Sequence, residues 1–145
     1  MNLCFTEYIN GKPTFFKEKI LCGFLKEEQT RHFKPKFHTI RRKRSDINSS
    51  AKEWSVGETI QFCTSLESGG ELPFGLETRC ILIQEISIVW KDKKIPDIVI
   101  DGLNLTIAEI QELAINDGFE ALEDFLSYFA SDFNGILIHW TTFKY

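Results

Sequence analysis

The segment of residues 80–90 constrains the fold most, because it carries the clearest strand pattern in the chain. Ile86, Ile88 and Trp90 are spaced two residues apart, which places them on one face of a β-strand. Shorter apolar runs bounded by turn residues predict three further strands, at residues 59–63, 98–100 and 136–140. The chain is therefore expected to build a sheet from strands that are spread along its sequence.

Helical spacing marks three other segments. Apolar residues at 15, 16, 20 and 21 predict a short helix that Gly23 can end. Thr106 and Glu109 form a capping box at the start of a second helix, and an apolar stripe over residues 119–129 predicts a third. Turns are expected at Asp101-Gly102 and at Asn134-Gly135. This order of elements predicts an α+β fold with a mostly antiparallel sheet.

The length and composition fit one domain that spans residues 1–145. The chain is 43% hydrophobic and has 13 Phe, which is enough to build a core. It has no apolar leader and no run of about 18 apolar residues, so we expect no membrane segment. The four cysteines are scattered, which predicts reduced thiols and a cytoplasmic protein. No His or Cys has metal-ligand spacing, and we expect neither a metal nor a cofactor.

One strongly basic segment interrupts this acidic chain, whose net charge is −4. Residues 31–44 contain seven Lys or Arg and no acid. The segment belongs to a longer stretch, residues 26–53, that reads as a basic and partly irregular loop region. Such a charge run is typical of a solvated loop, but it also suits a surface that binds an anionic partner such as a nucleic acid. Trp54 can stack on a base there or belong to the core.

Lys36, Thr39 and Arg41 form a candidate polar site within this segment. A Thr hydroxyl is a nucleophile only when a base takes its proton, and Lys36 can be that base if burial and neighbouring cations lower its pKa. The guanidinium of Arg41 can bind a phosphate or a carbonyl oxygen. Positions 36 and 39 face opposite sides of a regular strand, so the backbone must bend between them if they are to meet.

Asp117 is a second candidate, because it follows the capping-box helix in the break before the next apolar stripe. A carboxylate there can face a pocket. Alternatively, Asp117 and Glu120 can simply cap the following helix. His139 lies in the apolar run of residues 136–140, where we expect a core histidine with hydrogen-bond partners.

Four motifs in this order resemble the ASCH domain family, which belongs to the PUA-like superfold. They are Lys36-x-x-Thr39-Ile40-Arg41, Trp54-x-x-Gly57-Glu58, the segment 113–119, and the closing segment 135–141. Together they cover the chain from about Phe15 onward. The chain looks most like ASCH proteins of bacteria and their phages, and this resemblance implies a small β-barrel with flanking helices.

The resemblance also implies a ligand, RNA or a modified nucleoside, bound in a cleft lined by the Lys-Thr-Arg segment. Binding is then expected from one set of residues: His38, Arg41, Arg42, Lys43, Arg44 and Trp54. One branch, the bacterial N4-acetylcytidine amidohydrolases, is similar in Thr14-Phe15-Phe16 and in Ile20-Leu21-Cys22-Gly23 as well. That branch implies a catalytic set of Lys36, Thr39 and Asp117, although it has Glu where this chain has Asp117. A protein-interaction module is the third alternative.

Overall fold

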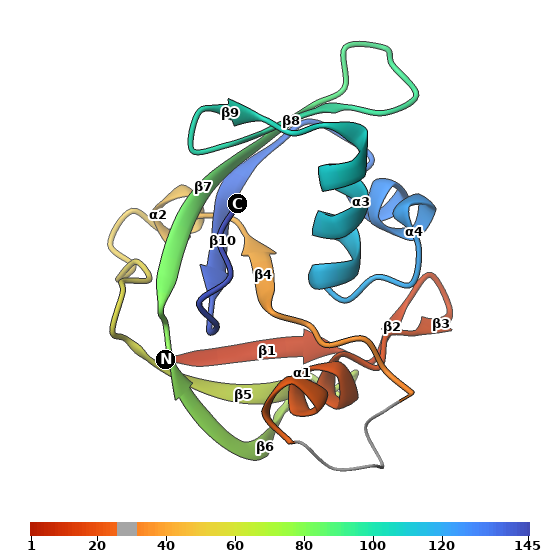
Figure 1. Cartoon of the computed structure of the whole chain (residues 1–145). Helices are drawn as coiled ribbons and strands as arrows, with labels where there is room; N and C mark the ends of the chain where they lie inside the picture. The colour runs from red at the N-terminus through yellow and green to blue at the C-terminus, as the bar shows by residue number, and fades with distance from the viewer. Residues whose placement is uncertain (26–31) are drawn as a thin grey trace.

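The strands form three separate sheets in the part of the chain that the computed structural model describes, residues 1–25 and 32–145 (Figure 1). The first sheet has the order β1-β5-β6, with β1 at Asn2–Thr6, β5 at Thr59–Ser65 and β6 at Glu71–Arg79. The second has the order β4-β10-β7-β8-β9, with β4 at His38–Arg41, β10 at Phe133–His139, β7 at Leu82–Val89, β8 at Asp97–Ile100 and β9 at Leu103–Asn104. The third is the hairpin of β2 (Tyr8–Ile9) and β3 (Lys12–Pro13).

Four helices accompany these sheets among the described residues: α1 (Phe16–Phe24), α2 (Arg44–Ile47), α3 (Ile107–Asn116) and α4 (Leu122–Tyr128). β1 and β5 pair in parallel and every other strand pair is antiparallel. The expected α+β fold with mostly antiparallel sheets is therefore confirmed. The ladders do not close into one barrel in the described residues, so the barrel stays a prediction. No helix in residues 1–25 and 32–145 is long and apolar enough to cross a membrane.

Strand β10 lies between two hydrophobic cores. Leu137 packs into the core that α3 and α4 form on one face of the five-stranded sheet. Ile136 and Ile138, on the opposite face of the strand, pack into the second core with α1 and the three-stranded sheet. Because successive side chains of a strand point to opposite faces, one apolar strand serves both cores. Figure 1 shows α3 and α4 on the side of the molecule opposite β7.

Local signals placed several elements correctly. Strand β7 carries the expected alternation, and Ile86 and Ile88 are buried. The Thr106 capping box is present at the start of α3. Asp101 and Gly102 form the two-residue turn between β8 and β9, and both have positive φ, as a type I′ hairpin requires.

The expectation that residues 26–53 form an irregular loop region is wrong in part. β4 is a strand of the five-stranded sheet, and α2 adds one helical turn after it. The strand forms because β10 supplies its hydrogen-bond partners and Ile40 is buried opposite Leu137. Residues 26–31 of this region lie outside the described residues.

Two smaller expectations are also wrong. Asn134-Gly135 is not a turn but part of β10, where a Cβ on Gly135 would collide with the carbonyl oxygen of Arg41. The glycine is thus needed for close approach of two strands and not for a bend. Cys4 and Cys63 face each other across β1 and β5 and form a disulfide. The argument from reduced thiols to a cytoplasmic location therefore loses its basis.

Candidate active site

The residues singled out in the sequence meet at one small cavity. Lys36, Thr39, Arg41 and Asp117 all line a cavity of about 40 Å³. Thr39 and Arg41 come from one face of β4, and Asp117 is the residue that caps the C-terminus of α3. Lys36 precedes the strand, in a segment without regular structure. Its side chain is thus free of the strand alternation that would have separated it from Thr39.

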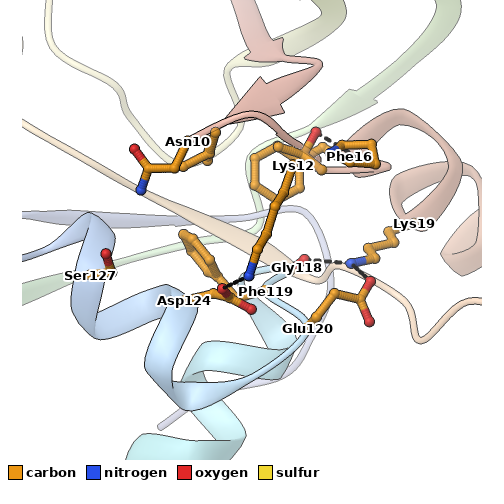
Figure 2. A pocket seen from close by; sticks show the side chains of 12 residues that line it. Asn10, Lys12, Phe16, Lys19, Gly118, Phe119, Glu120, Asp124 and Ser127 are labelled. Carbon is orange, nitrogen blue, oxygen red and sulfur yellow. Dashed lines mark hydrogen bonds and ion pairs between the residues drawn. The ribbon is translucent and has the colours of Figure 1, made fainter.

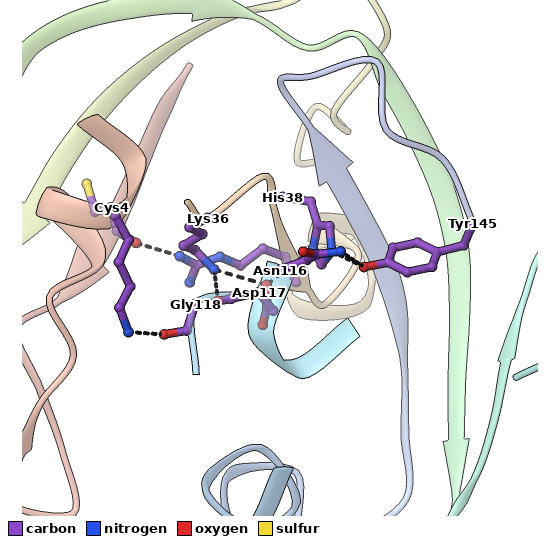
Figure 3. Close-up of polar contacts among 9 residues, drawn as sticks. Cys4, Lys36, His38, Asn116, Asp117, Gly118 and Tyr145 are labelled. Carbon is purple, nitrogen blue, oxygen red and sulfur yellow. Dashed lines mark hydrogen bonds and ion pairs between the residues drawn. The ribbon is translucent and has the colours of Figure 1, made fainter. Parts of the chain in front are cut away.

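The ammonium of Lys36 is buried against Asp117 (Figure 3). Its Nζ donates to the main-chain carbonyl of Asp117 and, at 3.0 Å, to the carboxylate oxygen Oδ1. The two side chains are 1% and 6% exposed, so water screens this pair very little. Nζ also lies 4.7 Å from the ring centre of Phe16, where the π-face favours a cation.

Burial lowers the pKa of Lys36 to about 8, although the carboxylate of Asp117 opposes the change. The positive charges of Arg41 and Lys19 lower this pKa further. For Asp117, burial by itself would raise the pKa, but the charge of Lys36 and the contact with His38 outweigh it, and the pKa of the carboxyl is lowered. The pair therefore combines an ionised carboxylate with a lysine that releases its proton near neutral pH.

The loop that follows α3 holds Asp117 in place. Gly118 has φ +94°, and a Cβ there would lie 2.9 Å from ring carbons of Phe16. Lys19, on α1, is buried and its Nζ donates to the carbonyl of Gly118 at 2.7 Å. The alternative role for Asp117 as a cap of the next helix is wrong, because Ala121 caps the N-terminus of α4.

A buried cluster of polar groups lies against the other side of the carboxylate. His38 Nδ1 lies 3.4 Å from Asp117 Oδ1 without the geometry of a hydrogen bond, and His38 Nε2 is hydrogen-bonded to Tyr145 Oη at 2.7 Å. Asn116 Nδ2 donates to the same Oη at 3.1 Å, so the phenol can donate to Nε2 and leave the proton of His38 on Nδ1. Burial lowers the pKa of His38, which fits a neutral ring.

His38 is fully buried, so its expected role in direct nucleic-acid contact is wrong. The ring supports Asp117 instead. His139 lies opposite it on β10 and is also fully buried, as expected of a core histidine. The expectation of hydrogen-bond partners for His139 is wrong within the described residues, where neither ring nitrogen has one. Burial accordingly lowers its pKa to about 3.

Arg41 is partly buried, and its guanidinium has no carboxylate partner among the described residues. Nη2 donates to the carbonyl of Cys4 at 2.6 Å, and the group lies 5.1 Å from the ring centre of Phe5. Its Nε is buried and has no hydrogen-bond partner in the described part of the chain. Burial lowers the pKa of Arg41, but an arginine stays charged at any physiological pH. An unsatisfied cationic donor at a cavity wall is suited to bind an anionic oxygen.

Arg42, Lys43 and Arg44 do not line this cavity. Arg42 is exposed with its guanidinium 5.8 Å from the ring of Phe133, and Lys43 pairs with Glu85 at 2.6 Å. Arg44 lies over Trp54 at 5.6 Å. Trp54 is only 8% exposed and packs in the second core, so its expected role as a base-stacking residue is wrong. The expected binding residues therefore divide into an inner set and an outer set.

Three contributors to the site escaped sequence reasoning: Lys19, Asn116 and Tyr145. Each acts through a contact with a residue that is distant in sequence. Asn116 lies in the motif segment 113–119, but no role was expected of it, and Lys19 and Tyr145 belong to no motif. Among the described residues, one group of potential metal ligands comes together, Cys4, Cys63 and Glu71. The two sulfurs are joined in the disulfide, so they do not offer thiolates to a metal.

Comparison with known proteins adds no relative, since no family model, curated protein or solved structure matches this chain. The resemblance to the ASCH domain thus stays a prediction that depends on the motifs.

Proposed function

We propose that this protein is a hydrolase that removes a short acyl group from the amine of a nucleobase. The observation that carries the proposal is the buried Lys36–Asp117 pair on the wall of a cavity that Thr39 and Arg41 also line. A base with a pKa of about 8, a hydroxyl and an unsatisfied cationic donor are the three groups that nucleophilic amide hydrolysis needs. The nucleobase and the ASCH-type barrel are inferred from the motif resemblance.

Neutral Lys36 is suited to act as the base because of its two bonds to Asp117. An uncharged amine has two N–H groups and one lone pair. The carbonyl and the carboxylate of Asp117 accept the two N–H groups, which leaves the lone pair for the proton of Thr39. The Thr39 oxygen then bonds to the acyl carbon as Lys36 takes its proton, and the carbonyl π electrons move onto the oxygen.

Arg41 stabilises the oxyanion that results. Its side chain lines the cavity, its Nε has no hydrogen-bond partner among the described residues, and the two cations and one carboxylate of the cavity carry a net positive charge. Collapse of the adduct breaks the bond between carbon and nitrogen, and the departing amine takes the proton from Lys36. Water next attacks the Thr39 ester with Lys36 again as base, which releases a carboxylic acid and restores the hydroxyl.

The size of the cavity limits the acyl group. The cavity is small, with a volume of about 40 Å³. Aromatic residues line it, among them Phe5, Tyr128 and Phe129. Acetyl is therefore expected to be a better acyl group than butyryl or benzoyl.

Hydrolysis of N4-acetylcytidine, followed by chromatography, tests the proposal. Wild-type protein is expected to release cytidine and acetate, and Lys36→Met is expected to lose about 100- to 10,000-fold in kcat/KM. Lys43→Met is the matched control, because that lysine is ion-paired at the surface and lies outside the cavity. Equal turnover by wild type and Lys36→Met, or no turnover by wild type, would refute the proposal.

Nucleic-acid binding is a second candidate function, and a separate observation favours it. Arg42, Lys43 and Arg44 follow one another at the end of β4, and Arg42 is exposed. Replacing all three by Gln should reduce the dependence of log K on log salt by about 0.7–0.9 for each phosphate that the variant no longer neutralises. An unchanged affinity and salt slope for single-stranded RNA would exclude this surface.

A further inference from the structure

A larger pocket adjoins the catalytic cavity. It has a volume of about 230 Å³ and lies between the β2–β3 hairpin, the loop after α3 and α4 (Figure 2). We call it the outer pocket and define it by Lys12, Phe16, Lys19, Phe119, Glu120 and Asp124. Ile9, Phe16 and Phe119 line both the outer pocket and the cavity. The two spaces therefore share part of their walls.

The charges of the outer pocket are already paired. Lys12 reaches from the hairpin to Asp124 at 3.2 Å, and Lys19 contacts Glu120 at 2.6 Å (Figure 2). Lys19 also donates to the carbonyl of Gly118. Among the described residues that line the pocket, both lysines thus have a carboxylate partner, and no unpaired cation awaits a phosphate.

The carboxylates keep capacity to accept hydrogen bonds. Each ion pair uses one oxygen, Oε1 of Glu120 or Oδ1 of Asp124. A carboxylate has about four acceptor sites, so each can take a further hydroxyl proton. The rings of Phe16 and Phe119 meet edge to face with centres 6.0 Å apart and give the pocket an apolar wall. A phosphate finds no net positive charge here, because a carboxylate balances each lysine, whereas a flat ring that carries a hydroxyl-rich group finds matching partners.

We propose that the outer pocket is a subsite for the amine-bearing half of the substrate, with the ring against the aromatic wall and sugar hydroxyls on Glu120 and Asp124. This subsite assignment rests on the proposed hydrolase function, because the acyl group bound in the cavity fixes the orientation of the rest of the substrate. The substrate class is then an unphosphorylated nucleoside, and a nucleotide within a nucleic-acid chain is disfavoured. Glu120 and Asp124 are the specificity-determining residues.

Calorimetric titration with deacylated ligands tests the subsite without catalysis. Cytidine is expected to bind wild-type protein more tightly than cytosine, and more tightly than cytidine 5′-monophosphate. A hydrogen bond to a charged group contributes about 1.5–3 kcal/mol, so Glu120→Gln and Asp124→Asn should each weaken cytidine binding by roughly 10- to 100-fold. Glu123→Gln, an exposed neighbour on α4 that does not line the pocket, is the matched control.

The outcomes separate this inference from the proposed function. Cytosine or the monophosphate binding as well as cytidine would overturn the subsite, as would equal cytidine affinity in wild type and both variants. If Glu120→Gln unfolds because Lys19 loses its partner, Asp124→Asn decides the result alone. Cytidine binding that depends on these carboxylates would support the subsite even if N4-acetylcytidine were not hydrolysed, a result that would defeat only the proposed function.

Discussion

Replacing Asp117 by Asn should lower the pKa of Lys36 from about 8 to below neutrality. At the 3.0 Å separation of the ion pair and an effective dielectric constant of about 20, the attraction is about 5 kcal/mol. Because both side chains are almost fully buried, solvent removes little of it. A loss of 1.36 kcal/mol of attraction corresponds to about one pKa unit, so the charged form of Lys36 loses most of its electrostatic stabilisation in the variant. The main-chain carbonyl of residue 117 still accepts a bond from Nζ and keeps the side chain in place.

Nuclear magnetic resonance of the Lys36 side-chain nitrogen measures this pKa directly. In wild type the resonance should titrate near pH 8, and in Asp117→Asn it should stay that of a neutral amine throughout the neutral range. The pH–rate profile should change in the same way. The inflection that wild type shows near pH 8 should move to a more acidic pH in the variant. A wild-type Lys36 that titrates at its ordinary 10.5, or a pKa unchanged by Asp117→Asn, would refute the electrostatic reasoning.

The same pKa predicts how stability changes with pH. The folded pKa of Lys36 lies below the unfolded value of 10.5, so between about pH 8 and 10.5 the unfolded chain binds more protons. This residue therefore makes stability rise with pH across that window, by about 3 kcal/mol in total. Urea unfolding at the two ends of the window should show the rise in wild type and not in Lys36→Met. An equal pH dependence in both proteins would contradict the burial of this lysine.

Three further perturbations test the framework around the site. Gly118→Ala should lower the unfolding free energy by about 1–3 kcal/mol more than Gly57→Ala, because both glycines have positive φ but only at 118 does a Cβ meet the Phe16 ring; equal losses in urea titrations would contradict the packing. Cys63→Ser should lower the unfolding free energy by about 4 kcal/mol, since the disulfide closes a separation of 59 residues. If reducing conditions leave the melting temperature of the wild-type protein unchanged, the bond is absent. Tyr145→Phe should cost about 1–3 kcal/mol in the same titrations by leaving buried partners unsatisfied, and no loss would exclude the hydrogen bonds of its hydroxyl.

Sequence patterns predicted correctly those elements that depend only on neighbouring residues. The alternation in β7, the capping box of α3 and the Asp101-Gly102 turn each depend on a few neighbouring residues, and each is present. The catalytic set Lys36, Thr39 and Asp117 was expected from motif resemblance, and the structure brings the three residues to one cavity. Their chemical roles remain proposals.

Other features depend on contacts between distant residues, and there the sequence was a poor guide. The basic character of β4 concealed a strand, because its stability comes from pairing with β10 near the other end of the chain. The disulfide joins cysteines that no spacing rule connects. Asn134-Gly135 carries a turn signature, yet Gly135 lies in a strand that needs a residue without a Cβ. His38 belonged to a basic run, but its ring is fully buried beside Asp117.

The hydrolysis rate of N4-acetylcytidine by two Thr39 variants shows whether the Thr39 hydroxyl attacks with Lys36 as its base. Thr39→Ser keeps a hydroxyl, whereas Thr39→Val keeps the shape and removes it. We expect the serine variant to retain turnover and the valine variant to lose at least about 100-fold in kcat, with the melting temperature of both near that of wild type. Equal and substantial turnover by the two variants would show that the hydroxyl plays no part in the reaction and would refute the proposed attack by Thr39.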